Sequence, residues 1–248
     1  MEYDKNYYNK FTSKDNLYNC NRPIIKTTRA LYQTNPPFQY MSLISIGFGN
    51  VGYLDMFNKK FGEVTGVEIN PESIEQAKGK YSVHLINLAA PDIDCSLLSD
   101  IVACHYLFEH LADNDISILI KNMTKIAPIN NITLTDKDSP NYIEDPTHKN
   151  PKTLKQWKDF MREIYKSQGF VLVKNQSNSF TFMEENMYKR AKNLVKEIQT
   201  IYDHKYLTEV MCKDITAENT LVERKEKKNE NMGTTIVKEA VPDVSRWL

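Results

Sequence analysis

One segment indicates the fold most clearly: residues 41–52 read MSLISIGFGNVG. Its first six residues are apolar or small, as in a buried strand, and residues 51–60 have the pattern of a helix. The chain contains only 8 glycines, yet Gly47, Gly49 and Gly52 fall within this one segment. Clustered glycines allow the backbone to turn tightly or to approach a ligand closely. The segment therefore predicts a strand, a glycine loop and a helix in succession.

The glycine loop matches the pattern G-x-G-x-x-G, and an acid follows it at a suitable place. Glu68 stands near the end of residues 63–69, which predict a second strand. In a doubly wound sheet, an acid there accepts hydrogen bonds from a ribose diol, while the loop lies against the ligand. Nicotinamide dinucleotides and S-adenosylmethionine both place an adenosine ribose at this point. The alternative is that the glycines serve only a turn and that Glu68 is merely exposed.

Strands and helices continue to alternate as far as residue 174. Asn70 and Pro71 have the form of a helix start, with a capping side chain followed by proline at the first helical position. Further strands are predicted at residues 83–88, 100–104, 132–136 and 170–174, and further helices at residues 113–127 and 151–168. This alternation is typical of a mostly parallel sheet covered on both faces.

We therefore predict an α/β fold with a Rossmann-like, doubly wound core over residues 41–183. Residues 1–40 are expected to form an N-terminal cap. Residues 184–248 are expected to form a helical extension with a final strand and tail. An apolar stripe along residues 184–214 predicts core packing or a homodimer interface, with a cap over the substrate site as the alternative.

Composition limits the class of protein. The 248 residues correspond to one large domain or one domain with a cap. The 32 basic and 32 acidic residues cancel, which argues against nucleic acid as a partner. The 4 cysteines lack the spacing of a zinc site or a disulfide framework. No signal peptide or membrane span is evident in the sequence, so we expect a cytoplasmic location.

Four segments carry a resemblance to a known family. They are LISIGFG at residues 43–49, VEIN at 67–70, DIVACHYLFEHL at 100–111, and DPTH at 145–148 followed by a helix that ends in Gly-Phe. Over roughly residues 40–175 the chain resembles class I S-adenosylmethionine-dependent methyltransferases, especially those that modify small molecules and glycans. The resemblance implies S-adenosylmethionine as cofactor. It also implies methyl transfer to an oxygen or nitrogen of a small polar molecule or glycan precursor.

The resemblance also implies roles for individual residues. Glu68 would bind the ribose hydroxyls, with Ile69 against the adenine. His105 and Tyr106, expected just past the fourth strand, would face the methyl donor and the substrate. The complete cofactor-binding set that the resemblance implies is Gly47, Phe48, Gly49, Glu68, Ile69, Asn87, Leu88, His105 and Tyr106.

Two histidines are the catalytic candidates. Methyl transfer mainly requires alignment of donor and acceptor, but a hydroxyl or ammonium acceptor benefits from a base, and histidine is poised near neutral pH. His148, in a loop beside Asp145, is the first candidate, with substrate contact and helix capping as alternatives. His105 is the second. We predict no metal site, because no carboxylate completes a set with His105 and His110.

Two other functions stay open. An NAD(P)-dependent oxidoreductase would suit the glycine loop, but no Tyr-x-x-x-Lys pair stands at the expected place. A noncatalytic binding subunit with the same fold is the second alternative. It is kept because Ser45, Val51 and Asn87 stand where the family usually has an acid, a glycine and an aspartate.

Overall fold

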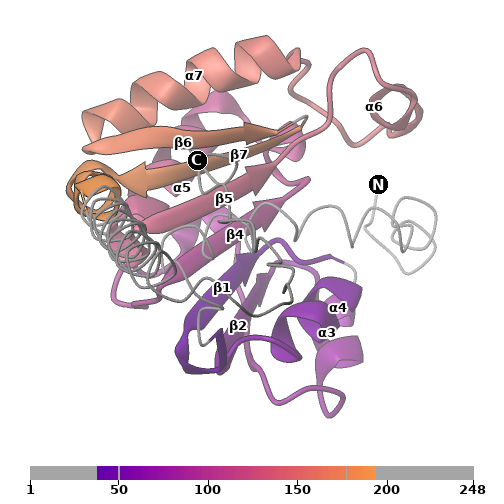
Figure 1. Ribbon diagram of the computed structural model, residues 1–248. Coiled ribbons are helices and arrows are strands. Elements are labelled where there is room, and N and C mark those ends of the chain that lie inside the picture. Colours follow the sequence, from indigo (N-terminus) through magenta and orange to yellow (C-terminus); the bar gives the residue numbers. More distant parts are fainter. Residues whose placement is uncertain (1–37, 50, 177, 194–248) are drawn as a thin grey trace, which may run out of the picture. The chain divides into compact units, whose positions relative to one another are not determined.

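A seven-stranded sheet forms the centre of the computed structural model, which describes residues 38–49, 51–176 and 178–193 (Figure 1). The strand order is β3-β2-β1-β4-β5-β7-β6. Strands β1 to β5 pair in parallel, whereas β7 runs antiparallel to both β5 and β6. The strands are β1 (Ser42–Ile46), β2 (Glu63–Glu68), β3 (His84–Asn87), β4 (Ile101–His105), β5 (Ile129–Thr133), β6 (Phe170–Gln176) and β7 (Ser179–Glu184).

Helices cover both faces of this sheet (Figure 1). From residue 38 to residue 167, the helices of the described part are η1 (Phe38–Tyr40), α3 (Gly52–Asn58), α4 (Pro71–Ala77), η2 (Ala90–Asp92), η3 (Phe108–His110), α5 (Asp113–Ile126), α6 (Pro140–Glu144) and α7 (Leu154–Ser167). Because side chains alternate across a strand, Leu43 packs in the cluster with α3 and α4, whereas Ile44 packs with α5 and α7. Each face therefore has its own apolar core.

The helix starts follow from local chemistry. Pro71 is the first residue of α4, and the Asn70 side chain accepts a hydrogen bond of 2.8 Å from the Glu72 N–H. At α7, Thr153 forms a reciprocal capping box with Gln156. That box begins the helix at Leu154, three residues later than the sequence predicts.

The doubly wound, mostly parallel sheet is confirmed, and two of its strands need correction. The fifth strand occupies Ile129–Thr133 instead of residues 132–136. Its Asn130 and Asn131 look unsuited to a core, but both are fully buried and hydrogen-bonded. Strand β7 was not predicted at all. Helix α6 was not predicted either.

Several expectations fall on residues outside the described part. The predicted N-terminal cap lies there apart from its last three residues. Residues 185–193 are helical, and Met187 and Tyr188 pack against the α3 face of the core, which favours core packing for the start of the stripe. A compact unit extends to Lys189, and a second begins at Arg190. Within the described residues, no helix has the length and apolar character that a membrane crossing requires.

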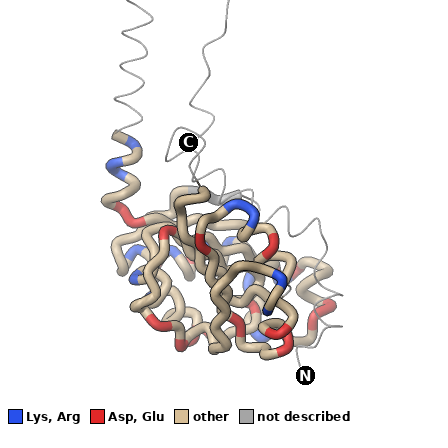
Figure 2. Tube along the Cα trace, turned by 90° about the horizontal axis from the view of Figure 1, so that it is seen from below, with Lys and Arg blue, Asp and Glu red and all other residues tan. Residues whose placement is uncertain are grey.

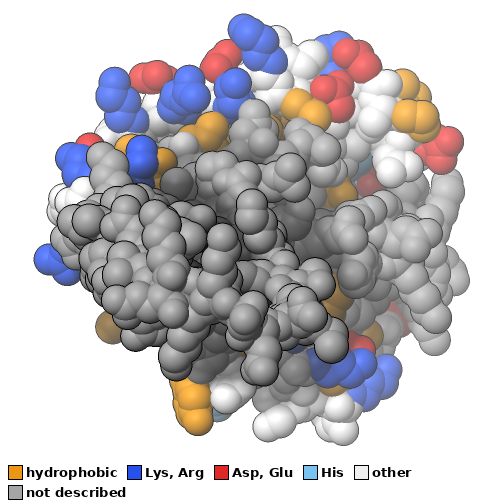
Figure 3. Space-filling view, in the orientation of Figure 1, with side chains coloured by type: hydrophobic (Ala, Val, Ile, Leu, Met, Phe, Trp, Pro, Cys, Tyr) orange, Lys and Arg blue, Asp and Glu red, His pale blue; other side chains and the backbone are white. Residues whose placement is uncertain are grey.

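Surface charge is mixed in sign along the described trace (Figure 2). Over α7, lysine and arginine side chains alternate with acidic ones (Figure 3). The surface of α7 therefore has no continuous basic stripe of the kind that follows a nucleic-acid backbone.

Candidate functional site

The carboxyl ends of β1 to β5 lie along one edge of the sheet, because these strands are parallel (Figure 1). In open α/β sheets this edge is where ligands bind. The glycine loop follows β1 there, Glu68 ends β2 and Asn87 ends β3. The topology thus brings together most of the cofactor-binding residues that the sequence indicated.

The glycine loop requires its first glycine for two reasons. Gly47 has a φ of +66°, in the left-handed region that side chains disfavour. A Cβ atom at Gly47 would also lie 2.9 Å from Cδ2 of Leu107. Leu107, which comes shortly after β4, therefore covers the loop. The contact between Leu107 and Gly47 is not evident from the sequence, because only the pairing of β1 with β4 brings the two segments together.

Replacing Gly47 with alanine should lower the free energy of unfolding by about 1–3 kcal/mol. Gly79 is the matched control: its φ is +74°, but a Cβ there meets nothing within 4 Å. Urea unfolding should show a larger loss for Gly47→Ala than for Gly79→Ala. The losses of Gly47→Ala and Leu107→Ala should also sum to more than that of the double variant. Strict additivity would contradict the contact between Gly47 and Leu107.

Glu68 holds the glycine loop in place through a hydrogen bond to the loop backbone. Its side chain is buried, and its Oε2 accepts a hydrogen bond of 2.8 Å from the Gly49 N–H. Its Oε1 accepts a hydrogen bond of 3.0 Å from the Asn70 N–H. Burial raises the pKa of Glu68, while these backbone hydrogen bonds act in the opposite direction. Carboxylate oxygens have more than one lone pair each, so Glu68 can also accept hydrogen bonds from a ligand.

An exposed apolar side chain, that of Ile69, follows Glu68. The Ile69 side chain is 60% exposed, which is unusual for isoleucine. The Asn87 side-chain nitrogen donates to the carbonyl oxygens of Glu68 at 2.8 Å and Ile69 at 2.9 Å. The Leu88 N–H donates to the Glu68 carbonyl at 3.1 Å. Asn87 and Leu88 thus fix the backbone that presents Ile69.

The side chain of Phe48 does not line this edge, which corrects its implied role. Phe48 is 2% exposed and belongs to the core beneath α3. A Cβ atom on Gly66 would lie 2.9 Å from Cε1 of the Phe48 ring. The ring therefore fills the space that Gly66 leaves in β2.

His105 also differs from expectation, because it is the last residue of β4 and does not follow it. Its side chain is buried beside the rings of Tyr53 and Phe57, whose centroids lie 5.4 and 6.0 Å away. Its Nε2 lies 3.2 Å from Oδ1 of Asn131. Burial lowers the pKa of His105 to about 4, although the bond to Asn131 opposes this. An imidazole whose pKa is lowered to about 4 is a weak base near neutral pH, so we do not retain this role for His105.

This burial predicts a pH-dependent stability. His105 has a lower pKa in the folded chain, about 4, than its ordinary value of 6.5, so its stabilising effect is complete above pH 6.5. This stabilising effect is lost as the pH falls from 6.5 to about 4, because the unfolded chain binds the proton more readily. Between about pH 7.5 and about pH 5, urea unfolding should lose about 2 kcal/mol more for the wild type than for His105→Gln. Equal losses would show that His105 is not enclosed.

Tyr106 lies just past β4, as predicted. Its φ is +52°, the only positive φ of a non-glycine residue among the described residues. Its N–H donates to the Thr133 carbonyl at 2.8 Å, and its hydroxyl accepts from the Asn178 side chain at 3.2 Å. The carboxyl ends of β4 and β5 are thus tied together at this residue.

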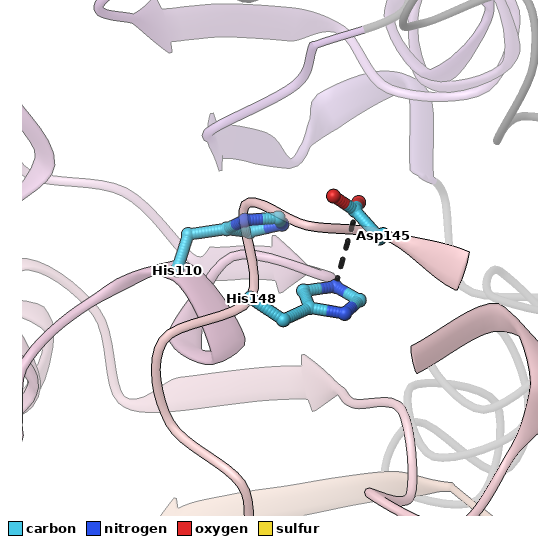
Figure 4. Close-up of side chains that lie close together, drawn as sticks. All are labelled: His110, Asp145 and His148. Atoms are coloured by element: carbon cyan, nitrogen blue, oxygen red, sulfur yellow. Dashed lines mark ion pairs between the residues drawn. The ribbon is translucent and has the colours of Figure 1, made fainter. Parts of the chain in front are cut away.

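A second polar cluster contains His110, Asp145 and His148 (Figure 4). His110 ends η3, Asp145 follows α6, and His148 lies in the turn after it. The Nε2 atom of His148 lies 3.7 Å from Oδ2 of Asp145, and their side chains are 6% and 3% exposed. The His148 ring stacks on Tyr142, with a centroid distance of 4.3 Å, and lies 4.6 Å from the His110 ring.

Hydrogen bonds set the orientation of both imidazoles. The Nδ1 atom of His148 lies 3.0 Å from the Tyr142 carbonyl, which can only accept, so Nδ1 carries the proton. The Thr147 hydroxyl donates to Asp145 Oδ1 at 2.6 Å and therefore accepts from Nδ1 of His110 at 3.0 Å. Burial lowers the pKa of His110 to about 4, with a further lowering from His148. His110 is therefore neutral at pH 7.

Glu109 connects this cluster to the rest of the edge. Its carbonyl accepts hydrogen bonds from the N–H groups of Lys149 at 2.8 Å and Asn150 at 3.1 Å. Its Oε1 accepts from the Thr135 N–H. Within the described residues, its buried Oε2 has no hydrogen-bond partner, and neither does the Tyr142 hydroxyl. Burial raises the pKa of Glu109 to about 7.

The premise behind the predicted absence of a metal site is therefore wrong. A carboxylate, Asp145, does complete a set of ligand-type side chains, with His110 and His148 in place of His105. One potential ligand atom from each residue lies within 4.8 Å of the others. Asp145 and His148 are neighbours in the sequence, but His110 comes from a separate segment that only the tertiary structure brings to them.

Comparison with known proteins agrees with the geometry. Residues 44–127 match a family model described as a methyltransferase domain. No curated protein matches the chain significantly. Residues 44–127 are thus similar to a methyltransferase domain, a kind of domain that uses S-adenosylmethionine, and the strand order matches the Rossmann-like fold of class I methyltransferases.

Several solved structures share this fold. Magnesium protoporphyrin IX methyltransferase from Synechocystis PCC 6803, with bound S-adenosylmethionine, aligns with a TM-score of 0.54 and 11% identity over 74% of this chain and 86% of that one. An S-adenosylmethionine-dependent methyltransferase from Archaeoglobus fulgidus gives a TM-score of 0.50 and 23% identity over 78% and 92%. A sugar N-methyltransferase from Streptoalloteichus sp ATCC 53650 gives 0.50 and 12% over 69% and 93%.

A small RNA methyltransferase also aligns, with a TM-score of 0.52 and 15% identity over 66% of this chain. The match spans only 26% of that longer protein. At these identities the likeness concerns the fold, and the acceptors that the names describe are diverse.

Proposed function

We propose that the protein transfers a methyl group from S-adenosylmethionine to an oxygen or nitrogen of a small polar molecule or glycan precursor. The carrying observation is the glycine loop that Glu68 braces, at the ligand-binding edge of a sheet with the class I strand order. The sugar N-methyltransferase among the structural neighbours is consistent with a polar acceptor. The mixed surface charge over α7 does not favour a nucleic-acid acceptor.

The residues present suit the cofactor. Gly47 and Gly49 have positive φ angles and no side chains, so the loop backbone can approach a ligand closely. Glu68 offers carboxylate oxygens to a ribose diol, and the exposed Ile69 offers an apolar surface to an adenine. Asn87, Leu88 and Tyr106 would border the same site. When bound, the cofactor supplies a methyl group on a sulfonium that is its own leaving group.

The acceptor would be held on the other side, near His148. Its Nδ1 proton is directed at the Tyr142 carbonyl, so in this tautomer the lone pair of the His148 ring lies on Nε2. That lone pair faces Asp145 in the loop after β5. His148 is therefore the residue that we propose acts on the acceptor, either by receiving its proton or through the arrangement described in the next subsection.

Calorimetric titration of the full chain tests the proposal. S-adenosylmethionine and S-adenosylhomocysteine should bind with micromolar affinity, and NADH should not. A screen of amino and hydroxy sugars should then identify an acceptor by the formation of S-adenosylhomocysteine. Binding of NADH alone would favour the oxidoreductase alternative. Binding of the sulfur compounds without turnover on any acceptor would favour the noncatalytic one.

A further inference from the structure

We propose that His110, Asp145 and His148 form a binding site for a zinc-class divalent metal ion. The three side chains come from two separate segments, the end of η3 and the turn after α6 (Figure 4). One potential ligand atom of each lies within 4.8 Å of the others. This inference does not depend on methyl transfer, because the site is defined by its own side chains.

The separation between His148 and Asp145 is typical of two ligands of one ion. Their Nε2 and Oδ2 atoms lie 3.7 Å apart. This distance is too long for a hydrogen bond, which requires about 3.2 Å or less. Two atoms that bind a tetrahedral ion at about 2.0–2.2 Å lie roughly 3.3–3.6 Å from each other. The observed distance therefore needs only a small side-chain adjustment.

The orientation of the pair also suits a cation. In the tautomer that the Tyr142 carbonyl selects, the Nε2 lone pair of His148 points toward Oδ2 of Asp145. Both side chains are almost completely buried. A metal ion between these two atoms would bind both of them.

The surroundings resemble the outer shell of a metal site. Ligating histidines usually donate their other ring N–H to a carbonyl or a polar side chain, and ligating carboxylates are themselves hydrogen-bonded. Here His148 donates to the Tyr142 carbonyl and His110 to the Thr147 hydroxyl. Oδ1 of Asp145 accepts from the N–H and hydroxyl of Thr147, at 2.9 and 2.6 Å. All three side chains are thus held in place by hydrogen bonds.

A buried acceptor atom beside the cluster supports this assignment. Glu109, adjacent to His110, is fully buried, and its Oε2 has no hydrogen-bond partner in the described part of the chain. Buried polar atoms normally have a partner, and one without a partner calls for an explanation such as an ion. An ion at the cluster would place a positive charge near this oxygen.

The ligand types determine the kind of metal. Two imidazoles and one carboxylate favour zinc and its transition-metal neighbours over magnesium or calcium, which prefer oxygen ligands. Three protein ligands leave a coordination position open, as in catalytic zinc sites. His148 would then act as a ligand, and an acceptor oxygen could occupy the open position. This last step rests on the proposed function, whereas metal binding does not.

Titration of the chelator-treated full chain with Co²⁺ tests the site. We expect one Co²⁺ ion per chain, visible d–d absorption bands and a rise in the thermal unfolding midpoint. Asp145→Asn and His148→Gln should each weaken Co²⁺ binding by about 10–100-fold or more. The control His84→Gln, at an exposed histidine on β3, should bind like the wild type.

The site is refuted if the wild type binds no Co²⁺, or if both variants bind it as the wild type does. Circular dichroism of each variant identifies any that fails to fold, and His110→Gln then replaces it. Titration with S-adenosylhomocysteine on the same samples separates the two proposals. Cofactor binding without Co²⁺ binding would overturn only the metal site, and the reverse result would overturn only the methyltransferase function.

Discussion

Glu68→Ala is expected to weaken S-adenosylhomocysteine binding by about 100-fold or more. Charged hydrogen bonds contribute about 1.5–3 kcal/mol each, and two ribose hydroxyls would lose such partners. The variant also removes the acceptor that holds the Gly49 N–H at 2.8 Å, so the glycine loop loses its brace. Calorimetric titration of wild type and variant measures the difference directly.

Glu63→Ala is the matched control for this prediction. Glu63 begins the same strand that Glu68 ends, and its side chain is exposed at the opposite edge of the sheet. Its replacement should leave the affinity unchanged within about twofold. An affinity for Glu68→Ala within threefold of the wild type would mean that the ligand does not lie over the end of β2, and the cofactor site would have to be sought elsewhere.

The second large effect is expected at His148. His148→Ala should lower the rate of methyl transfer by about 10²–10⁴-fold, the range associated with loss of a positioned acid, base or ligand. The affinity for S-adenosylhomocysteine should hardly change, because the proposed cofactor residues lie at the ends of β1 to β4 and His148 lies after β5. Initial rates at saturating cofactor, with the acceptor found by screening, provide the measurement.

The exposed histidine of β3 again provides a control, since His84→Ala should retain full activity. If the affinity of His148→Ala for the cofactor fell by the same factor as its rate of methyl transfer, His148 would belong to the cofactor site. Unchanged rates would remove His148 from the reaction and leave its cluster as a structural feature of the loop.

The sheet and the cofactor edge were predictable because their signals are local. Glycines after an apolar strand, an acid at the end of the next strand and an Asn-Pro helix start all lie within residues 41–71. The family resemblance extended this to the later strands. The prediction of β5 was wrong at its start, because Asn130 and Asn131 are polar residues in a buried strand. Their hydrogen-bond partners are distant in the sequence: Tyr165 for Asn130, and Ser179 and Thr181 for Asn131.

The acceptor side was much less predictable. The fourth strand was predicted to end at Cys104, one residue too early, and this displacement placed His105 at the edge when it actually packs beneath α3. Side chains alternate along a strand, so a shift of one residue exchanges a site residue for a core residue. The meeting of His110 with His148 depends on the path of a long loop, for which no local pattern exists.

The anchoring of that loop has a consequence for protein engineering. The Glu109 carbonyl receives two N–H groups from Lys149 and Asn150, and the Asn150 side chain donates to Leu111 and Asp113. The loop and η3 therefore form one transplantable module. A chimera that exchanges residues 136–153 alone would separate the loop from its anchor, whereas one that also exchanges residues 108–113 would keep the acceptor side intact and leave the cofactor strands untouched.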